Sequence, residues 1–555
     1  TVGAEDSFFT LGGDSIMSML LVSRARQAGL TITARQVFEH KTPAALAKAG
    51  VSVTEDDSPV THEPDVPVGT VPLTPVMLEL AEKAGAAALS GAVSQSMLIE
   101  TPVGLEYSRL VAATQALLDH HDMLRARLAD GHLVVPAKGE AASAADCVTR
   151  VDGADGVDLG EAARQAAERL DPAAGVMLQA VWFDAGPDLP GRLLLVAHHL
   201  VVDGVSWRIL LPDLVTAHEG GDLEPGTSFR RWAGTLAEQA VSAERLAELP
   251  VWTRLLDGPE SRLGKRPLDP TVDTPANGLH HASLTTPVAT AQELLTSVPA
   301  ALDAGVDEVL LAGLVAAVGE WRRRRRRNLA GGVVVNVEGH GRVPLSPDMD
   351  LTRTVGWFTN SQPVRIDPGT SEYAEIRAGG AATRAVVGRV REQMRAVPGD
   401  GLGYGLLRYL NPDTAEAMAE LPSAQIGFNY LGRFTAGSAE ESPGGPASGS
   451  AWQPVGDNVL AGTGDADTPV SHVLHAEGLV RDLPGGPELT LSLTTPAGVL
   501  DQAAVSALAE GWVAMLSGIA ASAADAVPDD TESPLVSLDQ DQLHALQSKL
   551  SEEKD

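Results

Sequence analysis

His198-His199-Leu200-Val201-Val202-Asp203-Gly204 joins two segments of different periodicity. The residues before it, Leu193 to Ala197, form a short apolar run that is typical of a buried strand. The residues after it, Val205 to Leu211, have the apolar spacing of a helix. A strand that ends in an imidazole, with a carboxylate four residues later, can support proton transfer near neutral pH. Adjacent histidines at a strand end are also common as surface or structural groups, so this pattern needs a second signal.

A second acid/base cluster lies far downstream. Val333 to Val337 has the composition of another strand, and Glu338-Gly339-His340-Gly341-Arg342 follows it. Glycines in both clusters allow the backbone to turn sharply after the polar groups. Glu338 can also be interpreted as a solvated strand-end carboxylate, but burial would raise its pKa and suit it to proton transfer.

The two clusters resemble motifs of the epimerization domains of nonribosomal peptide synthetases, which are relatives of the condensation domains. Four further segments are similar to motifs of that family and occur in the same order over about residues 71 to 525. They are His120-His121-Asp122-Met123-Leu124-Arg125, Arg353-Thr354-Val355-Gly356-Trp357-Phe358-Thr359, Gly401-Leu402-Gly403-Tyr404-Gly405-Leu406-Leu407-Arg408-Tyr409 and Gly427-Phe428-Asn429-Tyr430-Leu431-Gly432.

The N-terminal segment Leu11-Gly12-Gly13-Asp14-Ser15-Ile16 resembles the attachment site of a peptidyl carrier domain. The resemblance implies that 4'-phosphopantetheine is attached covalently to Ser15. Carriers that feed epimerization domains are similar in having Asp before this serine. A serine at a helix start would also hold its phosphodiester near a favourable helix N-terminus. The same residues fit a simple helix N-cap, and both interpretations can hold together.

Composition narrows the possible partners. The chain has 555 residues, 44% of them hydrophobic, and a formal net charge of -32. This length predicts several domains or lobes, and the charge argues against a nucleic-acid partner. The run Arg322 to Arg327 follows an apolar helical pattern that Asp307 is expected to cap. We interpret the run as a solvated helix C-terminus, with a docking patch for an acidic carrier domain as the alternative.

Several classes of site are not expected. A single cysteine, Cys147, cannot form an internal disulfide or a zinc ribbon. We find no metal-ligand set, no nucleotide-binding glycine loop, no signal segment and no uninterrupted apolar run of membrane-spanning length. The sequence therefore predicts a cytoplasmic protein without a metal or a membrane partner.

The fold class expected from these patterns and the resemblance is α/β. Residues 1–50 are expected to form a helical-bundle carrier domain whose first helix is incomplete, with one helix from Ser15 toward Gly29 and another opened by Thr42-Pro43. Residues 51–70 are expected to be a tether that keeps the carrier at high local concentration. The resemblance implies two chloramphenicol-acetyltransferase-like lobes in a V, with the active site in a tunnel between them. We place the lobes at residues 71–255 and 256–525, with a C-terminal linker and short helix at 526–555.

Three smaller features follow from the sequence of the lobes. Asp257 to Leu279 is expected to cross between them, Gly437 to Ser450 to form a surface loop, and Leu489 to Leu493 to form an alternating strand. A helix around Ala503 to Ile519 is expected to close the second lobe.

The resemblance implies roles for individual residues. His199 and Glu338 would be the acid/base groups on either side of a substrate Cα, each supplied by a different lobe. Asp203 would be a structural carboxylate paired with Arg125 or Arg353, and His198 and Gly204 would shape the loop. Asn429 and Tyr430 would line the tunnel or pack beside it. Trp207 and Trp357 are expected in the core.

The expected reaction is epimerization at Cα of an L-aminoacyl or peptidyl thioester carried on phosphopantetheine. The expected partners are that thioester and neighbouring synthetase domains, with adenylation upstream and condensation downstream. Two alternatives remain: an amide-forming condensation domain, and an inactive domain that recruits other enzymes. The intact His199 and Asp203 count against the inactive form, and the Glu338 cluster favours epimerization over condensation.

Overall fold

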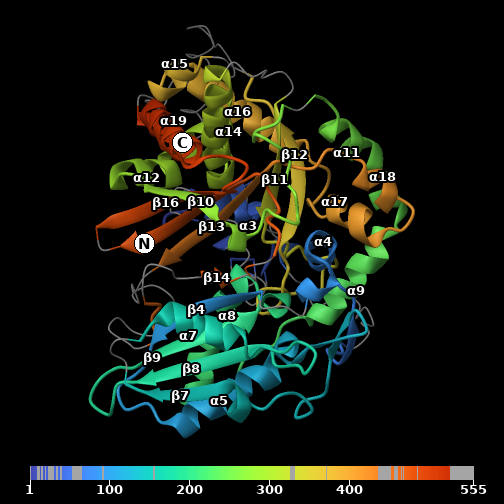
Figure 1. Ribbon diagram of the computed structural model, residues 1–555, viewed down its shortest axis with the longest axis vertical. Coiled ribbons are helices and arrows are strands. Elements are labelled where there is room, and N and C mark those ends of the chain that lie inside the picture. Colours follow the sequence, from blue (N-terminus) through green and yellow to red (C-terminus); the bar gives the residue numbers. More distant parts are fainter. Residues whose placement is uncertain are drawn as a thin grey trace, which may run out of the picture.

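The computed structural model separates most of the chain into two α/β lobes, each built on its own sheet (Figure 1). The structure describes residues 2–4, 6–8, 13, 17–18, 21–22, 25, 30–32, 36–37, 40–49, 51–52, 65–89, 93–153, 157–259, 261–325, 332–369, 372–435, 452–455, 461–463, 466, 468–483 and 485–524. The expected α/β fold with two lobes is confirmed. The predicted loop at 437–450, the C-terminal linker at 526–555, Ser15 and most of its helix lie outside the described residues.

The N-lobe contains a five-stranded sheet with helices on both faces. Its strands, in spatial order, are β14 (Ala461–Thr463), β4 (Ser94–Glu100), β9 (Arg192–His198), β8 (Leu178–Asp184) and β7 (Val148–Asp152). Helix α7 (Leu159–Ala167) covers one face, and α5 (Tyr107–His120) and α8 (Gly204–Glu219) cover the other. Because both faces are covered, β9 is buried at every position after its first, which explains its continuous apolar sequence.

Short elements complete the N-lobe. A three-stranded sheet has the order β3 (Gly69–Val71), β6 (His132–Val135) and β5 (Arg127–Ala129). The remaining short elements are η1 (Ala86–Leu89), η2 (Asp122–Arg125), α6 (Ala144–Cys147) and η3 (His199–Val201). Cys147 is a buried free thiol, and burial raises its pKa to about 11.

The C-lobe contains a six-stranded sheet with one covered face. Its strands, in spatial order, are β10 (Leu279–Thr285), β16 (Gly486–Pro496), β15 (Leu474–Leu483), β13 (Ile426–Thr435), β11 (Val333–Gly339) and β12 (Asn360–Ile366). Buried and half-buried residues alternate along β15 and β16, as expected for strands with one apolar face. The strand expected at Leu489 to Leu493 is therefore confirmed.

Helices cover the apolar face of this sheet. They are α12 (Val288–Leu295), α13 (Ser297–Leu302), α14 (Val306–Arg324), α15 (Tyr373–Arg377), α16 (Ala382–Arg395) and α19 (Gln502–Ala524). Helix α19 is the expected closing helix. Within the described residues it is the one helix long and apolar enough to cross a membrane, a feature that the sequence analysis did not identify, and 61% of its most apolar stretch is buried in the lobe.

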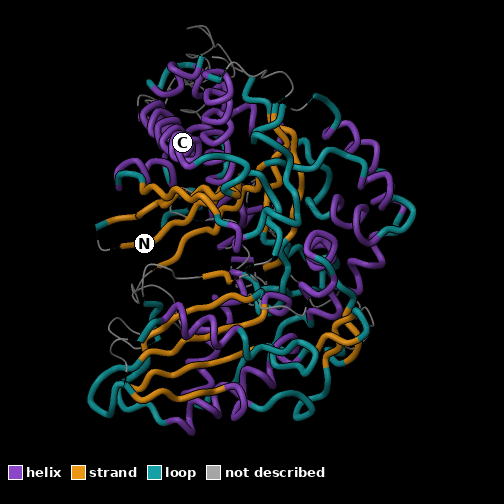
Figure 2. The backbone as a smooth tube through the Cα atoms, in the orientation of Figure 1, coloured by secondary structure: helices purple, strands orange, loops and turns teal. Residues whose placement is uncertain are grey.

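The chain crosses between the two lobes more than once, and helices and loops join the lobes (Figure 2). The chain leaves the N-lobe through α9 (Phe229–Ala240), α10 (Ala243–Leu246) and α11 (Leu249–Leu256). Helix α9 contacts β3 of the N-lobe and α11 contacts β12 of the C-lobe, so the chain crosses between the lobes in this helical segment. The prediction that it crosses at Asp257 to Leu279 was therefore wrong. That later segment contains η4 (Pro275–Asn277) and leads into β10.

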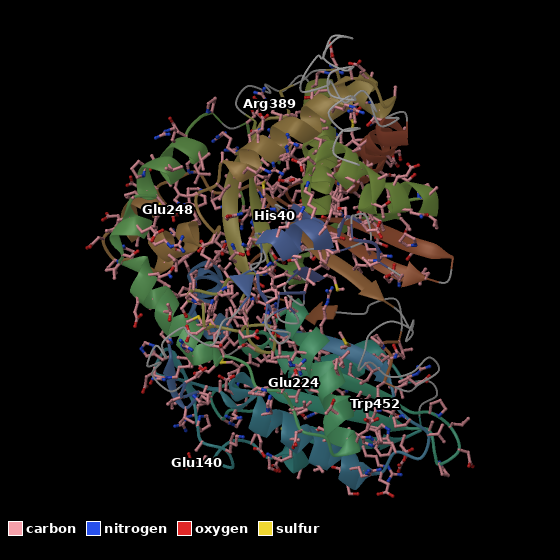
Figure 3. The ribbon with its side chains drawn as sticks, turned by 180° about the vertical axis from the view of Figure 1, so that it is seen from behind. His40, Glu140, Glu224, Glu248, Arg389 and Trp452 are labelled. Atoms are coloured by element: carbon pink, nitrogen blue, oxygen red, sulfur yellow. The ribbon has the colours of Figure 1, made fainter. Side chains whose placement is uncertain are left out.

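Two later segments return to the N-lobe. Met349, Leu351, Val355 and Phe358 pack into the N-lobe core, and so does Trp452, labelled in Figure 3. Strand β14 then extends the N-lobe sheet beside β4. Helix α4 (Pro75–Ala84) lies beside the junction of the lobes in Figure 1. The chain also forms the short helices α17 (Gly403–Gly405), η5 (Leu406–Leu410) and α18 (Ala415–Ala419).

The carrier-like segment contacts the C-lobe. Its described elements are β1 (Leu30–Thr31), α3 (Pro43–Ala49) and β2 (Val51–Ser52). The Thr42 hydroxyl accepts a hydrogen bond from Ala45 N–H, so the predicted Thr42-Pro43 helix start is confirmed. Figure 3 shows this segment, marked by His40, on the face opposite to that of Figure 1, and Lys41 pairs with Asp303.

The end of the predicted tether belongs to the folded N-lobe. Asp65 accepts hydrogen bonds from the backbone N–H and hydroxyl of Ser228, and Gly69–Val71 forms β3. The expectation of a free tether up to residue 70 was therefore wrong for residues 65–70. Residues 53–64 lie outside the described residues.

Two predictions about α14 were wrong. Gly305, not Asp307, is the N-cap, and the carboxylate of Glu308, three residues later, accepts its N–H. The arginine run does not begin in solvent, because Arg322 is 2% exposed and donates hydrogen bonds to the carbonyls of Ser261 and Gly332. Arg324 does lie at the surface, where it pairs with Glu320.

Candidate functional site

Strand β9 ends at His198, and the η3 turn begins at His199. His198 is fully buried, and its Nδ1 accepts the N–H of Leu200, which holds the η3 turn. Asp203 then caps α8 through a capping box with Ser206. Gly204 is the first residue of α8 and lines the cavity described below, so it does not form a sharp turn. The predicted strand, turn and helix are all present.

Asp203 also joins the two sequence clusters. Its Oδ1 lies 2.8 Å from Nη2 of Arg342, and both side chains are buried. Its Oδ2 accepts the N–H of Phe358 at 3.2 Å. The structural role expected for Asp203 agrees with these contacts, but both expected partners were wrong.

The two arginines proposed as partners bind elsewhere. Arg125 donates to the carbonyls of Leu118 and Asp119. Arg353 pairs with Asp213, which also accepts from His121. Arg125 and Arg353 both belong to motifs that resemble those of the family. Their contacts join segments within the N-lobe.

His199 faces a cavity and is held by neutral groups. Its Nε2 lies 3.0 Å from Nε2 of Gln95 on β4, and its ring lies 4.2 Å from the ring of Trp357. Burial lowers the pKa of His199, and the backbone groups of His199 and Val202 together with the carboxylate of Asp203 only partly offset this. The imidazole is therefore set up to be neutral near neutral pH and able to accept a proton.

Glu338 lies on β11 of the other lobe. Its Oε2 accepts a 2.8 Å hydrogen bond from Nδ2 of Asn429 on β13. Burial raises the pKa of Glu338, and the nearby His475 opposes this change. A carboxyl with a raised pKa can hold a proton at a higher pH than a solvated one, so Glu338 is suited to donate.

A row of polar residues surrounds Glu338 on the uncovered face of the C-lobe sheet. Strand register aligns Asn336, Gly427, His475 and Thr494. Gly427 leaves room for two rings, since a Cβ there would lie 2.5 Å from Nδ1 of His472 and 2.9 Å from Nδ1 of His475.

The two histidines beside Gly427, His475 and His472, have pKa values shifted in opposite directions. Nε2 of His475 lies 3.2 Å from Oε1 of Glu477. Burial opposes charge on His475, but the bond to Glu477 and the nearby carboxylates outweigh it, so its pKa is raised. Burial lowers the pKa of His472 well below its usual value.

One cavity of about 480 Å³ brings these groups together. From the N-lobe, Gln95, His199, Gly204 and Trp357 line it. The C-lobe side is lined by Asn336, Glu338, Asn429, His472, His475, Thr494 and their neighbours, and α4 adds Val76, Glu79, Leu80 and Lys83. His199 and Glu338 thus border the same space, whereas they are 139 residues apart in sequence.

The cavity does not include every residue that the sequence analysis placed near the substrate. Tyr430 packs against the C-lobe core and is not among the lining residues. Ser15 lies outside the described residues, so no geometry is assigned to a phosphopantetheine attached there. Trp207 is in the core as expected, and Trp357 both packs in the core and borders the cavity.

The sequence analysis missed three residues of the site. Arg342 lies in the same cluster as Glu338, and its place directly after Gly341 was a usable signal. Gln95 is a polar residue within a strand that is buried over most of its length, which is a weaker signal. Nothing local marked His475. Across the described residues, no group of three or more His, Cys, Asp or Glu side chains is placed to hold a metal ion.

Comparisons with known proteins agree with this architecture. A family model described as the condensation domain matches residues 86–451, and one described as the phosphopantetheine attachment site matches residues 1–49. The chain is 36% identical over 464 residues to one of the linear gramicidin synthase proteins of Brevibacillus parabrevis. That alignment covers 78% of this chain and 8% of the relative, so the chain spans less than a tenth of the relative's length.

Two solved structures have the same fold. The epimerization domain from the third module of tyrocidine synthetase B has a TM-score of 0.69 and 24% identity, over 83% of this chain and 99% of that one. The condensation domain from the monacolin K polyketide synthase MokA has a TM-score of 0.59 and 18% identity, over 82% and 98%.

Proposed function

Because this chain belongs to the condensation-domain family and begins with a phosphopantetheine attachment domain, we propose that it epimerizes the Cα of a carrier-bound aminoacyl or peptidyl thioester. The observation that carries the proposal is the shared cavity bordered by His199 and Glu338. Epimerization needs one group to remove the Cα proton and another to return a proton to the opposite face. Two lobes that each contribute one acid/base group meet this need.

The lowered pKa of His199 and the raised pKa of Glu338 favour one direction for the first proton transfer. His199, neutral, takes the Cα proton at Nε2, and the electron pair of the broken C–H bond moves into the thioester carbonyl as an enolate. Glu338, protonated, gives its proton to the other face of Cα, and the pair returns to carbon. No atom is gained or lost by the substrate. The enzyme is left with an imidazolium and a carboxylate, which exchange protons with water to restore the starting state.

Other cavity residues support the same chemistry. Asn429 donates to Glu338 and so fixes the orientation of its carboxyl. Asn336, Thr359 and Ser361 add amide and hydroxyl donors to the lining, which could stabilise charge on an enolate oxygen. The volume of about 480 Å³ is enough for an aminoacyl thioester and part of its pantetheine arm.

We propose Ser15 as the residue to which 4'-phosphopantetheine is attached. It rests on the resemblance of the residues around it and on the family match to residues 1–49. A phosphopantetheinyl transferase should add one 4'-phosphopantetheine to the chain, seen as a mass increase, and Ser15→Ala should abolish it. Ser7→Ala, a change of the same type nearby, should be loaded as fully as the parent chain.

Deuterium exchange tests the reaction. The chain is loaded with an L-aminoacyl-pantetheine in deuterated water, and Cα deuteration and product chirality are followed. We expect deuterated D-product, and His199→Ala and Glu338→Gln should each suppress it strongly. His132→Ala and Glu140→Gln are matched controls on the exposed N-lobe surface and should not change the rate. Full activity in both cavity variants would reject the assignment.

Condensation is the second candidate function, because the matched family model and one solved relative are condensation domains. Amide formation needs a base beside the nucleophile but gives no role to a proton-holding carboxyl from the second lobe. Formation of an amide with an acceptor carrier, without Cα exchange, would favour this candidate. Capture of a partner protein without either reaction would favour the inactive recruitment domain.

The proposed setting follows from the relatives. An adenylation domain would load the carrier before this step, and a condensation domain would use the product after it. We place these partners, and a cytoplasmic location, with the proposal, since the chain covers 8% of the length of the linear gramicidin synthase relative.

A further inference from the structure

A chain of two hydrogen bonds runs from α8 to His199 through β4. Nε1 of Trp207 donates to Oε1 of Gln95 at 2.9 Å, and Nε2 of Gln95 lies 3.0 Å from Nε2 of His199. Trp207 is fully buried and Gln95 is 8% exposed. Trp207 and Gln95 are therefore held inside the protein, and His199 lies at the wall of the cavity.

The chemistry of the donors decides which way the Gln95 amide faces. The indole N–H can only donate, so the amide oxygen must face Trp207. The amide NH₂ group then faces His199, and it too can only donate. Nε2 of His199 must accept this bond, which requires its lone pair to be free of a proton.

Each alternative arrangement leaves a buried conflict. If the amide turned over, its NH₂ group would face the indole N–H, and two buried donors would lose their acceptors. If Nε2 carried a proton, an imidazole N–H would face the amide N–H. The neutral imidazole with its proton on Nδ1 avoids both conflicts around Nε2, and Nδ1 is buried beside the backbone of His199 and Val202.

The charged groups near His199 do not reverse this conclusion. Asp203 follows His199 in the chain and favours the charged ring, but it is engaged by Arg342 and Phe358 N–H. The other titratable groups that line the cavity are Glu79 and Lys83 from α4, Glu338 from β11, His475 from β15 and His472 in the segment before it. The group that contacts Nε2 of His199 directly is the uncharged amide of Gln95.

We propose that Gln95, oriented by Trp207, is a positioning residue that keeps Nε2 of His199 unprotonated, so that the resting site accepts a proton at His199 rather than donating one. The catalytic meaning of this state rests on the proposed epimerization. When the Cα proton arrives at Nε2, the amide must release its bond. The bond thus sets the starting direction of proton transfer and is remade after each turnover.

Nitrogen NMR of the intact chain, labelled with ¹⁵N-histidine and without substrate, tests the resting state. The His199 signals are identified by their loss in His199→Ala. We expect Nε2 to have the shift of an unprotonated nitrogen at neutral pH, and Nδ1 that of a protonated one. A protonated Nε2 in the parent chain would overturn the proposal.

Gln95→Glu should give the opposite protonation state of Nε2 of His199. A carboxylate can accept from the indole N–H and from Nε2–H together, so Nε2 should become protonated at neutral pH. The acid limb of the Cα exchange rate should move up by about 1 to 3 pH units. Gln165→Glu, with the same charge change on the exposed face of α7, should leave both readouts unchanged.

A second variant covers the case in which Gln95→Glu does not fold. Gln95→Met keeps the side-chain size but removes both hydrogen bonds, and the His199 nitrogens should then show a mixture of tautomers. A parent-like spectrum in either variant would overturn the proposal. If the spectra behave as expected but no variant or parent exchanges Cα deuterium, the proposed reaction fails while the assignment of the His199 state stands.

Discussion

The guanidinium of Arg342 lies 2.8 Å from the carboxylate of Asp203, and this buried ion pair ties the His199 turn to the Glu338 strand. Both side chains are almost inaccessible, and further bonds engage them: Arg342 donates to the carbonyls of Leu351 and Thr354, and Ser206 donates to Asp203. The two acid/base groups of the cavity are thereby attached to one fixed junction between the lobes.

Removing one partner of this pair should destabilise the fold. Asp203→Ala leaves the Arg342 charge buried without its carboxylate, which typically costs about 3–5 kcal/mol. Denaturant unfolding measures the change. Lys265→Ala breaks an exposed ion pair with Asp501 and should leave the free energy of unfolding nearly unchanged. Equal effects of the two substitutions would contradict the role given to the junction.

The rate of Cα deuterium exchange should depend on pH with two limbs. Burial lowers the pKa of His199 from its usual 6.5, so the rate should rise with pH through a midpoint below 6.5, as the ring loses its proton. Burial raises the pKa of Glu338 above its usual 4.5, and the rate should fall again as that carboxyl ionises. Initial rates over a pH series give both limbs. A profile whose acid limb lies well above 6.5 would contradict the neutral resting state of His199.

Asn429→Ala should slow exchange without unfolding the chain. It removes the 2.8 Å bond that orients Glu338, and one such bond is worth about 1 kcal/mol, or several-fold in rate. Asn429→Asp should also raise the pKa of Glu338, because it adds a second carboxylate, and should move the alkaline limb upward. Asn277→Ala, on the exposed η4 turn, is the control. An unchanged rate and pH profile in both Asn429 variants would reject this role.

Gly341→Ala should be strongly destabilising. Gly341 has a φ of 63°, and a Cβ there would lie 1.8 Å from the Phe358 carbonyl oxygen. Gly388→Ala is the matched control, because Gly388 lies in α16 with no atom near its potential Cβ, and it should stabilise the helix by up to about 1 kcal/mol. Thermal unfolding would separate the two, and a tolerated Gly341→Ala would show that the turn can relax.

Within the arginine run, position should decide the effect of a substitution. Arg322→Met leaves the carbonyls of Ser261 and Gly332 without their buried donor and should cost about 1–3 kcal/mol. Arg324→Met, at a side chain that is 67% exposed, should change stability little. Denaturant unfolding measures both, and similar small effects would support the solvated helix end that the sequence suggested.

Local sequence patterns predicted local structure well. The strand, turn and helix around His199, the alternating strand near Leu491 and the helix start at Thr42-Pro43 each depend on residues within one or two turns of chain. Side-chain periodicity and capping act over that range, so they can be read along the sequence. The prediction of the N-cap of α14 was wrong because Gly305 and Asp307 are both acceptable cap residues, and only the backbone geometry distinguishes them.

The sequence alone determined the family-like motifs, their order and the two residues suited to acid/base chemistry. The tertiary structure decided which groups meet them: Arg342 with Asp203 across 139 residues, and Gln95 with His199 across 104. Strand order and lobe packing bring such pairs together, and the hydrophobic effect that drives this packing is non-directional and carries no local signature. The charge state of the cavity therefore depends on contacts that no stretch of sequence contains.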